Sequence, residues 1–375
     1  MEERYIYCGT KKLRCGYTTG TCAAAAAKAA AEALLTRRRV DTAEILTPKG
    51  VQLRLDIAKC VSDGEKALCS VIKDSGDDPD ITNGIEVCAE VSFIEAGIEI
   101  VGGKGVGTVT KAGLDQPVGA AAINTVPRRM IAQALNETAE LYEYRGGLRA
   151  VISVPKGEEL AHKTFNPRIG IVGGISIIGT TGIVEPMSNS AIIETIRTEA
   201  NIRRAEGIKT LVLTVGNYSE KFIFENRPEL SGQCVMCSNF IGDAIDIGIT
   251  LGFERILICG HIGKMVKLGS GIMNTHSSYA DGRMETLMTC GVLAGIDNAL
   301  LCRLNDCATT DAALDILYEN GAAQSVLDVL VRRIHTYLQA RAKGEAKVGA
   351  VIFSYRNDML LKTEYAYEII DELEV

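Results

Sequence analysis

The sequence predicts an α/β protein in which an N-terminal α+β two-layer domain is followed by a Rossmann-like, doubly wound domain. The first part of the chain carries one long alanine-rich stretch and then several short runs of β-forming residues, which is typical of an α+β layer. The pair Gly146 and Gly147 then interrupts the chain, and beyond it apolar runs, glycine-containing loops and helical stretches alternate. We therefore expect domains at residues 1–146 and 147–375.

In the first domain, alanine dominates residues 21–35 and predicts one long helix, because alanine is the best intrinsic helix former. A second helix is predicted over residues 127–144, with Pro127 in its first turn and Asn124 or Thr125 as its N-cap. Short runs bounded by turn residues predict strands at 43–46, 51–57, 67–72, 87–94 and 98–100.

In the second domain, several apolar runs are nearly unbroken in Val, Ile and Leu, as expected of strands covered on both faces. These strands are predicted at 149–154, 169–172, 210–215, 255–259 and 348–354. Helices are predicted between and after them, at 190–206, 238–251, 281–299, 311–318 and 325–342. In such a fold, ligands bind at the carboxyl ends of the strands.

The composition excludes several classes of protein. Hydrophobic residues make up 47% of the 375-residue chain and charged residues 23%, which indicates a globular protein. A net charge of -7 and only 5% aromatic residues argue against binding to nucleic acid or to an anionic membrane. Twelve cysteines without a basic and apolar leader predict reduced thiols and a cytoplasmic location. We expect a small-molecule substrate, and a homo-oligomer stays open.

The first candidate ligand loop is the run GYTTGTC, which ends where the alanine-rich helix begins. Its glycines let the backbone approach a ligand, its hydroxyls are donors, and the helix start offers unpaired N–H groups. Carboxylates or phosphates suit such a loop, while a loop that only caps the helix is the alternative. The candidate residues are Gly16, Tyr17, Thr18, Thr19, Gly20 and Thr21.

A second glycine-rich run covers residues 102–111 and resembles a phosphate-binding loop. It is not a P-loop, because Lys104 is followed by Gly105 rather than by Ser or Thr. Nor does it have the G-x-G-x-x-G spacing of a dinucleotide site. A plain turn and an anion site both stay open for this run.

A third set of glycines follows the apolar runs of the second domain. Small residues at the carboxyl end of a strand let the backbone come close to a ribose or an adenine, so three such strand ends together favour a nucleoside site. Glycines that only turn the chain are the alternative. The candidate residues are Gly173, Gly174, Gly179, Thr180, Thr181, Gly182, Gly216, Asn217 and Gly260.

Two of the four histidines fall in the glycine-rich window that follows the predicted strand at 255–259. His261 comes directly after that strand, and His276 is followed by Asp281 and Arg283. Histidine titrates near neutral pH and is suited to proton transfer, although a lone histidine is more often structural.

Six runs of this sequence, taken together, resemble the cobalt-precorrin-5B C-1 methyltransferases of anaerobic cobalamin biosynthesis. They follow one another over nearly the whole chain, which makes the resemblance far more specific than any single glycine loop. The runs are residues 13–27 (LRCGYTTGTCAAAAA), 73–84 (KDSGDDPDITNG), 103–113 (GKGVGTVTKAG), 122–130 (AINTVPRRM), 163–187 (KTFNPRIGIVGGISIIGTTGIVEPM) and 260–277 (GHIGKMVKLGSGIMNTHS).

The resemblance implies methyl transfer from S-adenosylmethionine to C-1 of a cobalt-bound macrocycle that carries acetate and propionate groups. The cobalt arrives inside the substrate, so we expect no metal held by protein side chains. We expect the third glycine set to cradle S-adenosylmethionine, and the GYTTGTC loop with Lys111 and Arg128 to bind the macrocycle's carboxylates. His261, His276 and Asp281 are the candidates for proton transfer.

Two other functions stay open from the sequence. A non-catalytic tetrapyrrole carrier would need only the GYTTGTC loop and basic residues. An ATP-dependent small-molecule kinase would use residues 102–111 for the phosphates. Binding of S-adenosylmethionine separates the methyltransferase from the carrier, and magnesium-dependent binding of ATP would favour the kinase.

Overall fold

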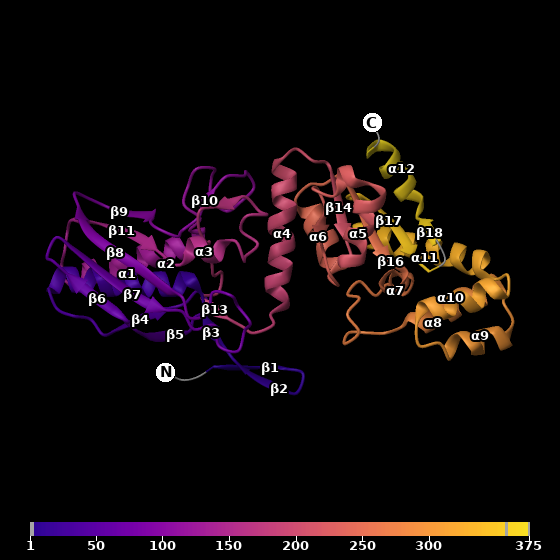
Figure 1. The fold of residues 1–375 in the computed structure, drawn as a ribbon, viewed down its shortest axis with the longest axis horizontal. Helices are drawn as coiled ribbons and strands as arrows, with labels where there is room; N and C mark the ends of the chain where they lie inside the picture. Colours follow the sequence, from indigo (N-terminus) through magenta and orange to yellow (C-terminus); the bar gives the residue numbers. More distant parts are fainter. Residues whose placement is uncertain (1–3, 357–358, 374–375) are drawn as a thin grey trace. The chain divides into compact units, whose positions relative to one another are not determined.

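The computed structural model describes residues 4–356 and 359–373. The chain divides into two compact units, unit 1 at Met1–Asn189 and unit 2 at Ser190–Val375 (Figure 1). Both units mix helices with strands, and parallel and antiparallel strand pairs are both present. The protein is therefore a mixed α/β protein.

Unit 1 is built around the alanine-rich helix α1 (Thr19–Thr36), which packs against strands β7 (Lys66–Ile72) and β8 (Glu86–Ile94) and against helix α2 (Thr125–Leu141) (Figure 1). All of its alanines are buried. Since alanine has the smallest apolar side chain, the backbones of α1, α2 and the sheet approach one another closely. The prediction of one long helix here is confirmed, and α2 confirms the second predicted helix.

The main sheet of unit 1 has the order β6 (Lys59–Ser62), β7, β8, β11 (Gly147–Ser153) and β9 (Ile98–Gly102). Neighbouring strands are antiparallel except β11 and β9, which run parallel. Two hairpins accompany this sheet, β1 (Tyr5–Cys8) with β2 (Lys11–Arg14) and β4 (Thr42–Leu46) with β5 (Gln52–Asp56).

The boundary between the units differs from the one expected at residues 146 and 147. Strand β11 lies inside the sheet of unit 1, between β8 and β9, so the chain does not leave this unit at Gly146. The apolar run that forms β11 identifies a buried strand but does not reveal which sheet contains it. Residues 147–189 accordingly belong to unit 1, and the division falls at Asn189.

The remaining strands of unit 1 are short. Strand β12 (Ile171–Val172) pairs antiparallel with β10 (Thr108–Val109), and β13 (Ile183–Val184) pairs antiparallel with β3 (Gly16–Tyr17). Helix α3 (Gly157–Ala161) follows β11. The run at 169–172 was expected to be a parallel strand of a doubly wound sheet. That expectation is wrong, because only two of its residues pair, and they pair with β10.

Unit 2 contains a sheet in the order β15 (Val235–Met236), β14 (Thr210–Thr214), β16 (Arg255–His261), β17 (Lys347–Ser354) and β18 (Met359–Lys362). The first four strands are parallel, and β18 is antiparallel to β17. One face packs on α5 (Asn217–Asn226) and α12 (Glu364–Leu373), and the other on α6 (Ile241–Thr250) and α11 (Ala323–Ala342). The predicted strands at 210–215, 255–259 and 348–354 are confirmed.

The other helices of unit 2 are α4 (Asn189–Ala205), η1 (Pro228–Leu230), α7 (Ile262–Met265), η2 (Val266–Ser270), α8 (Arg283–Ala294), α9 (Asn298–Asn305) and α10 (Thr310–Glu319). The single helix expected over 281–299 is two helices, because Gly295 caps α8 in the left-handed conformation and α9 begins anew at Asn298. Among the helices of the described ranges, none has both the length and the apolar character needed to cross a bilayer.

Candidate functional site

The polar groups at the start of α1 are hydrogen-bonded within the protein. Thr18 is the N-cap and its hydroxyl accepts from the Thr21 N–H at 3.2 Å. The Gly20 N–H donates to the Ile178 carbonyl at 3.0 Å, and the Thr21 hydroxyl donates to the Gly182 carbonyl at 2.7 Å. The expectation that this helix start offers free N–H groups to a ligand is therefore corrected. Thr18, Thr19, Gly20 and Thr21 are buried and join the loop to residues 178–182.

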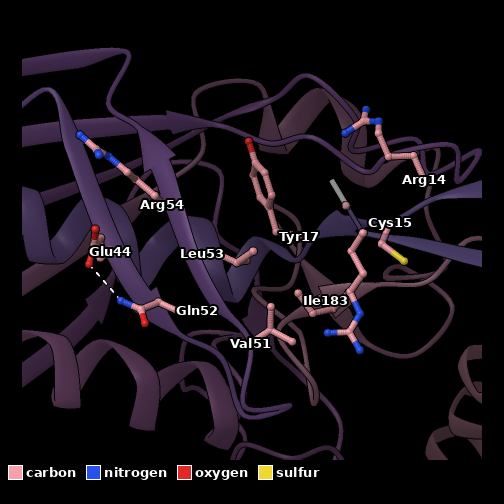
Figure 2. A pocket seen from close by; sticks show the side chains of 11 residues that line it. Arg14, Cys15, Tyr17, Glu44, Val51, Gln52, Leu53, Arg54 and Ile183 are labelled. Carbon is pink, nitrogen blue, oxygen red and sulfur yellow. Dashed lines mark hydrogen bonds between the residues drawn. The ribbon is translucent and has the colours of Figure 1, made fainter. Parts of the chain in front are cut away.

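The accessible end of the same loop lines a pocket of about 550 Å³ in unit 1, drawn in Figure 2. Gly16 and Tyr17 form part of its wall, and the β4–β5 hairpin supplies much of the remainder. Three arginines and one glutamate line it, and because Asp74 pairs with Arg14, its basic character comes from Arg4 and Arg54. The lining residues are Arg4, Arg14, Cys15, Gly16, Tyr17, Glu44, Val51, Gln52, Leu53, Arg54 and Ile183.

The arginines of this pocket differ in their partners. Both terminal nitrogens of Arg14 donate to Asp74, at 2.6 and 2.8 Å, so this guanidinium is neutralised by a bidentate pair. Arg54 donates from Nε to the Thr42 hydroxyl at 3.3 Å. This hydroxyl is neutral, so the bond does not offset the positive charge of Arg54. Figure 2 shows Arg54 and Arg14 on either side of Tyr17 in this view. The pocket therefore suits a ligand that carries carboxylates.

Two titratable side chains of the pocket are held in their neutral forms. Burial raises the pKa of the Cys15 thiol, Glu185 adds to the effect, and Arg4 and Lys49 oppose it. Burial, together with the nearby Cys22 and acidic groups, raises the pKa of Tyr17. The Tyr17 hydroxyl donates to the Ile72 carbonyl at 3.0 Å. Neither group is prepared to act as a nucleophile or base.

A buried ion pair supports the segment next to this pocket. The Lys73 side chain is only 2% exposed, and its ammonium donates to Asp80 at 2.5 Å and to the Ser75 hydroxyl. Burial acts to raise the pKa of Asp80, but Lys73 and the hydrogen bonds from Thr82 outweigh it, so the pKa is lowered. This pair holds the turn at residues 73–84, which follows β7.

In the glycine-rich run at 102–111, neighbouring backbone fills the space beside the glycines. The Gly103 N–H donates to the Ile152 carbonyl at 2.7 Å, and the Gly107 N–H donates to the Ile175 carbonyl at 2.9 Å. A Cβ on Gly105 would lie 1.9 Å from the Val154 carbonyl oxygen. These glycines allow the chains to approach one another, and their N–H groups are not arranged around a phosphate. The plain-turn alternative is favoured here.

The two basic residues assigned to the macrocycle have different surroundings. Arg128 donates to the carbonyls of Ile123, Ile100 and Ala121, at 2.8, 2.9 and 3.4 Å. Burial lowers its pKa, with Asp115 opposing. Its guanidinium is therefore occupied by the fold, contrary to the role expected from the sequence. The side chain of Lys111 lies against the backbone of Gly170.

The glycine-rich segment at 173–182 lies in unit 1 and not in the parallel sheet of unit 2. The Ile175, Ile177 and Ile178 N–H groups donate to the Gly105 carbonyl, the Ala122 carbonyl and the Thr19 hydroxyl. A Cβ on Gly174 would lie 2.3 Å from the Gly105 carbonyl oxygen. Gly173, Gly174, Gly179, Thr180, Thr181 and Gly182 thus belong to unit 1, whereas Gly216, Asn217 and Gly260 belong to unit 2, and the expectation of one donor site made from all nine residues stays a prediction.

The carboxyl ends of β14 and β16 in unit 2 bring together four of the expected residues, Gly216, Asn217, Gly260 and His261. These strands are parallel neighbours, so the loops that follow them lie at the same edge of the sheet. Gly216 has φ 86° and ψ 179°, a region that only glycine adopts readily, and it precedes the first turn of α5. A Cβ at this position would lie 3.4 Å from the Lys264 ammonium. We call these residues, together with Tyr218, Ser219 and Lys264, the strand-end site.

The orientation of His261 is fixed within the strand-end site. Its Nδ1 accepts from the Gly263 N–H at 3.1 Å, so the neutral ring carries its proton on Nε2. Burial lowers the pKa of His261, with Asp311 opposing. The ring also packs on Phe353 and Tyr218, with centroid distances of 5.6 and 6.0 Å. His261 is therefore a neutral hydrogen-bond donor.

The other two candidates for proton transfer lie in the loop before α8. Asp281 accepts from Arg283 at 2.5 and 2.9 Å, and the hydrogen bond from Arg283 is the main cause that lowers its pKa. His276 is exposed, and its Nδ1 contacts the Ser278 hydroxyl at 2.7 Å. The loop is tied to the residues after β15 by the Thr275 N–H, which donates to the Asn239 carbonyl at 3.0 Å. Asp281 is an ion-paired carboxylate and not an available base.

Sequence reasoning missed several residues of both sites. Lys264 stands in the quoted run GHIGK, but its position beside Gly216 depends on the pairing of β14 with β16. Ser219 and Thr214 carry buried hydroxyls without a partner among the described residues, which no sequence pattern signals. The pocket arginines Arg4 and Arg54 come from segments that contain no motif.

Comparison with known proteins identifies the family of this chain. The family model CbiD matches residues 6–186, and the model of the CbiD C-terminal domain matches residues 274–364. A protein of Ruminiclostridium cellulolyticum, named cobalt-precorrin-5B C(1)-methyltransferase, is 44% identical over 378 residues, covering 100% of this chain and 98% of that protein. The chain belongs to the CbiD family. The resemblance stated from the sequence motifs is thereby confirmed.

Two further members show the extent of the similarity. A cobalt-precorrin-5B C(1)-methyltransferase of Alkaliphilus metalliredigens is 42% identical, covering 99% of this CbiD chain and 98% of its own length. The crystal structure of a cobalamin biosynthesis protein (cbiD) from Archaeoglobus fulgidus is 30% identical and covers 73% of this chain and 86% of that one, with a TM-score of 0.40. The first CbiD match, residues 6–186, falls entirely within unit 1.

Proposed function

We propose that this CbiD-family chain is a cobalt-precorrin-5B C-1 methyltransferase, which uses S-adenosylmethionine and yields cobalt-precorrin-6A in anaerobic cobalamin biosynthesis. The observation that carries the proposal is the 44% identity over the whole chain to a relative of that name. We place the reaction in the cytoplasm, where its twelve cysteines stay as thiols.

We assign the methyl donor to the strand-end site and treat the sheet of unit 2 as a Rossmann-like platform. Four parallel strands with helices on both faces support this assignment, because nucleosides bind at the carboxyl ends of such strands. The residues fit the donor. Gly216 lacks a side chain at this edge, and the first turn of α5 has no side-chain cap. The space beside Gly260 is filled by Met265 and Val215, so Gly260 shapes the end of β16 and is not itself open to the donor. Residues 173–182 are left out of this site, because unit 1 uses many of their polar groups.

We assign the macrocycle's acetate and propionate groups to the pocket of unit 1. Its basic lining and the backbone at Gly16 support this assignment. The pocket takes the place of Arg128, whose guanidinium donates to backbone carbonyls. Of the residues expected from the sequence to bind the macrocycle, Gly16 and Tyr17 line this pocket.

The chemistry needs alignment more than acid or base catalysis. When bound, the donor supplies a methyl group on a positively charged sulfur, which keeps the bonding electrons as the new bond to C-1 forms. The protein orients the two molecules and excludes water. His261, neutral and with its Nδ1 occupied by the Gly263 N–H, can donate a hydrogen bond through Nε2–H, and we keep it as the candidate for that role. Asp281 is better described as an anchor for Arg283.

The test is an anaerobic incubation of the protein with methyl-labelled S-adenosylmethionine and cobalt-precorrin-5B, followed by mass analysis of the macrocycle. We expect one labelled methyl group at C-1 and an equal amount of S-adenosylhomocysteine. An unchanged macrocycle that stays bound to the protein would indicate the carrier instead. The kinase alternative loses its support, because the Gly103 and Gly107 N–H groups are already paired.

The assignment of the macrocycle predicts a selective loss of affinity. Replacing both Arg4 and Arg54 by Gln should raise the KM for the macrocycle roughly tenfold, because two exposed charge pairs are lost. The KM for S-adenosylmethionine should stay within about twofold. Arg38→Gln, an exposed arginine outside the pocket, is the matched control. A larger effect on the donor than on the macrocycle would reject the assignment.

A further inference from the structure

Lys264 is a half-buried cation for which the described residues provide no acceptor. No hydrogen bond or ion pair joins its ammonium to any residue of the ranges 4–356 and 359–373. Burial lowers its pKa, Cys237 opposes this effect, and the neighbouring Lys267 adds to it. An ammonium group partly removed from water and without a partner loses hydration, so a ligand anion would compensate it.

The first turn of α5 lies next to this ammonium. A Cβ placed on Gly216, the residue before the turn, would lie 3.4 Å from Lys264 Nζ. The Asn217 and Tyr218 N–H groups donate to no described residue, whereas the Ser219 N–H donates to the Gly216 carbonyl at 3.0 Å. Free N–H groups at the start of a ten-residue helix attract anions.

A buried hydroxyl gives an independent sign of a ligand. Ser219 is fully buried in this same turn, and its Oγ has no hydrogen-bond partner among the described residues. Because Cα–Cβ bonds in a helix tilt toward its N-terminus, the Cβ of Ser219 points toward the start of α5. The Thr214 Oγ1, at the end of β14, is likewise buried and unpartnered within the described chain. A buried hydroxyl without a partner is uncommon in a folded protein.

We propose that Lys264, the free N–H groups at the start of α5 and the Ser219 hydroxyl bind the α-carboxylate of S-adenosylmethionine. This inference rests on the proposed function and adds to it the contacts of the donor's amino-acid part. The aromatic ring of Tyr218 lies beside His261 at the same edge, where we expect it to contact the remainder of the donor. Lys264 is thus a binding residue that sets the position of the donor.

The test compares two nucleosides by isothermal titration calorimetry with the full chain. S-adenosylhomocysteine carries the α-carboxylate, and 5′-methylthioadenosine lacks the whole amino-acid part. Lys264→Gln should weaken the binding of S-adenosylhomocysteine about tenfold or more and change that of 5′-methylthioadenosine by less than about twofold. Lys264→Arg keeps the charge and should retain most of the affinity. Lys209→Gln, at an exposed lysine of the same unit, is the matched control.

The outcomes separate the inference from the proposed function. Equal losses for both nucleosides, or no loss for either, in a Lys264→Gln protein that melts like the wild type would overturn the carboxylate contact alone. A raised KM for the macrocycle with unchanged donor binding would show that Lys264 binds a carboxylate of the macrocycle instead. That result would also overturn the proposed contact with the donor. Failure of the wild-type protein to bind either nucleoside would count against the proposed function itself.

Discussion

Lys73→Met is expected to lower the free energy of unfolding of unit 1 by about 3–5 kcal/mol, because it leaves the buried side of Asp80 without its cation. Urea unfolding measures the loss of free energy, and hydrogen exchange of the α1 amides shows whether the loss occurs in unit 1. Lys59→Met, at an exposed lysine of β6 in the same sheet, should change the stability by less than about 0.5 kcal/mol.

The same ion pair predicts how the loss depends on pH. The pKa of Asp80 is lowered in the folded protein, so its stabilisation is complete above the unfolded pKa of about 4. The stabilisation disappears as the pH falls through the folded value. In Lys73→Met the burial that acts to raise the pKa of Asp80 is no longer opposed by Lys73, so the difference from wild type should be largest near neutral pH and shrink as the pH falls. A constant difference down to acidic pH would show that the pair is not its source.

Gly216→Val is expected to reduce the affinity for S-adenosylhomocysteine about 100-fold, the largest effect on binding that we predict. The φ of 86° is strained for valine by about 1–3 kcal/mol, and the new side chain would push against the Lys264 ammonium. Both changes displace the first turn of α5. Calorimetry with the folded variant measures the loss.

Gly232→Val is the matched control for this substitution. Gly232 lies in unit 2, its Cβ would meet nothing within 4 Å, and its backbone does not need a positive φ. We expect this variant to bind the nucleoside as the wild type does. A Gly216→Val protein that retains full affinity would exclude the strand-end site as the place of the donor.

Local sequence patterns predicted the elements of this protein well. The alanine run predicted α1, and the apolar runs predicted β14, β16 and β17. The patterns did not predict sheet membership, which depends on long-range pairing. Strand β11 has the same apolar character as the strands of unit 2, yet it pairs with β8 and β9. The domain boundary was therefore expected about 40 residues too early.

The candidate site was predicted only in part, for a related reason. Glycine marks a close approach, but its spacing does not tell whether a ligand or another backbone comes close. At Gly216 the space is open apart from Lys264, whereas at Gly105 and Gly174 it is filled by backbone. A test that relied on Gly174→Val would therefore disturb the packing of unit 1 before it reported on donor binding. The missing partner of Lys264 is visible only in three dimensions.

We propose that the methyl donor binds at the carboxyl ends of β14 and β16. A crystal structure of the protein with S-adenosylhomocysteine tests it most directly. We predict density beside Gly216, with the amino-acid carboxylate within hydrogen-bond distance of Lys264 Nζ. Density in unit 1 beside residues 173–182, with an empty strand-end site, would contradict the account.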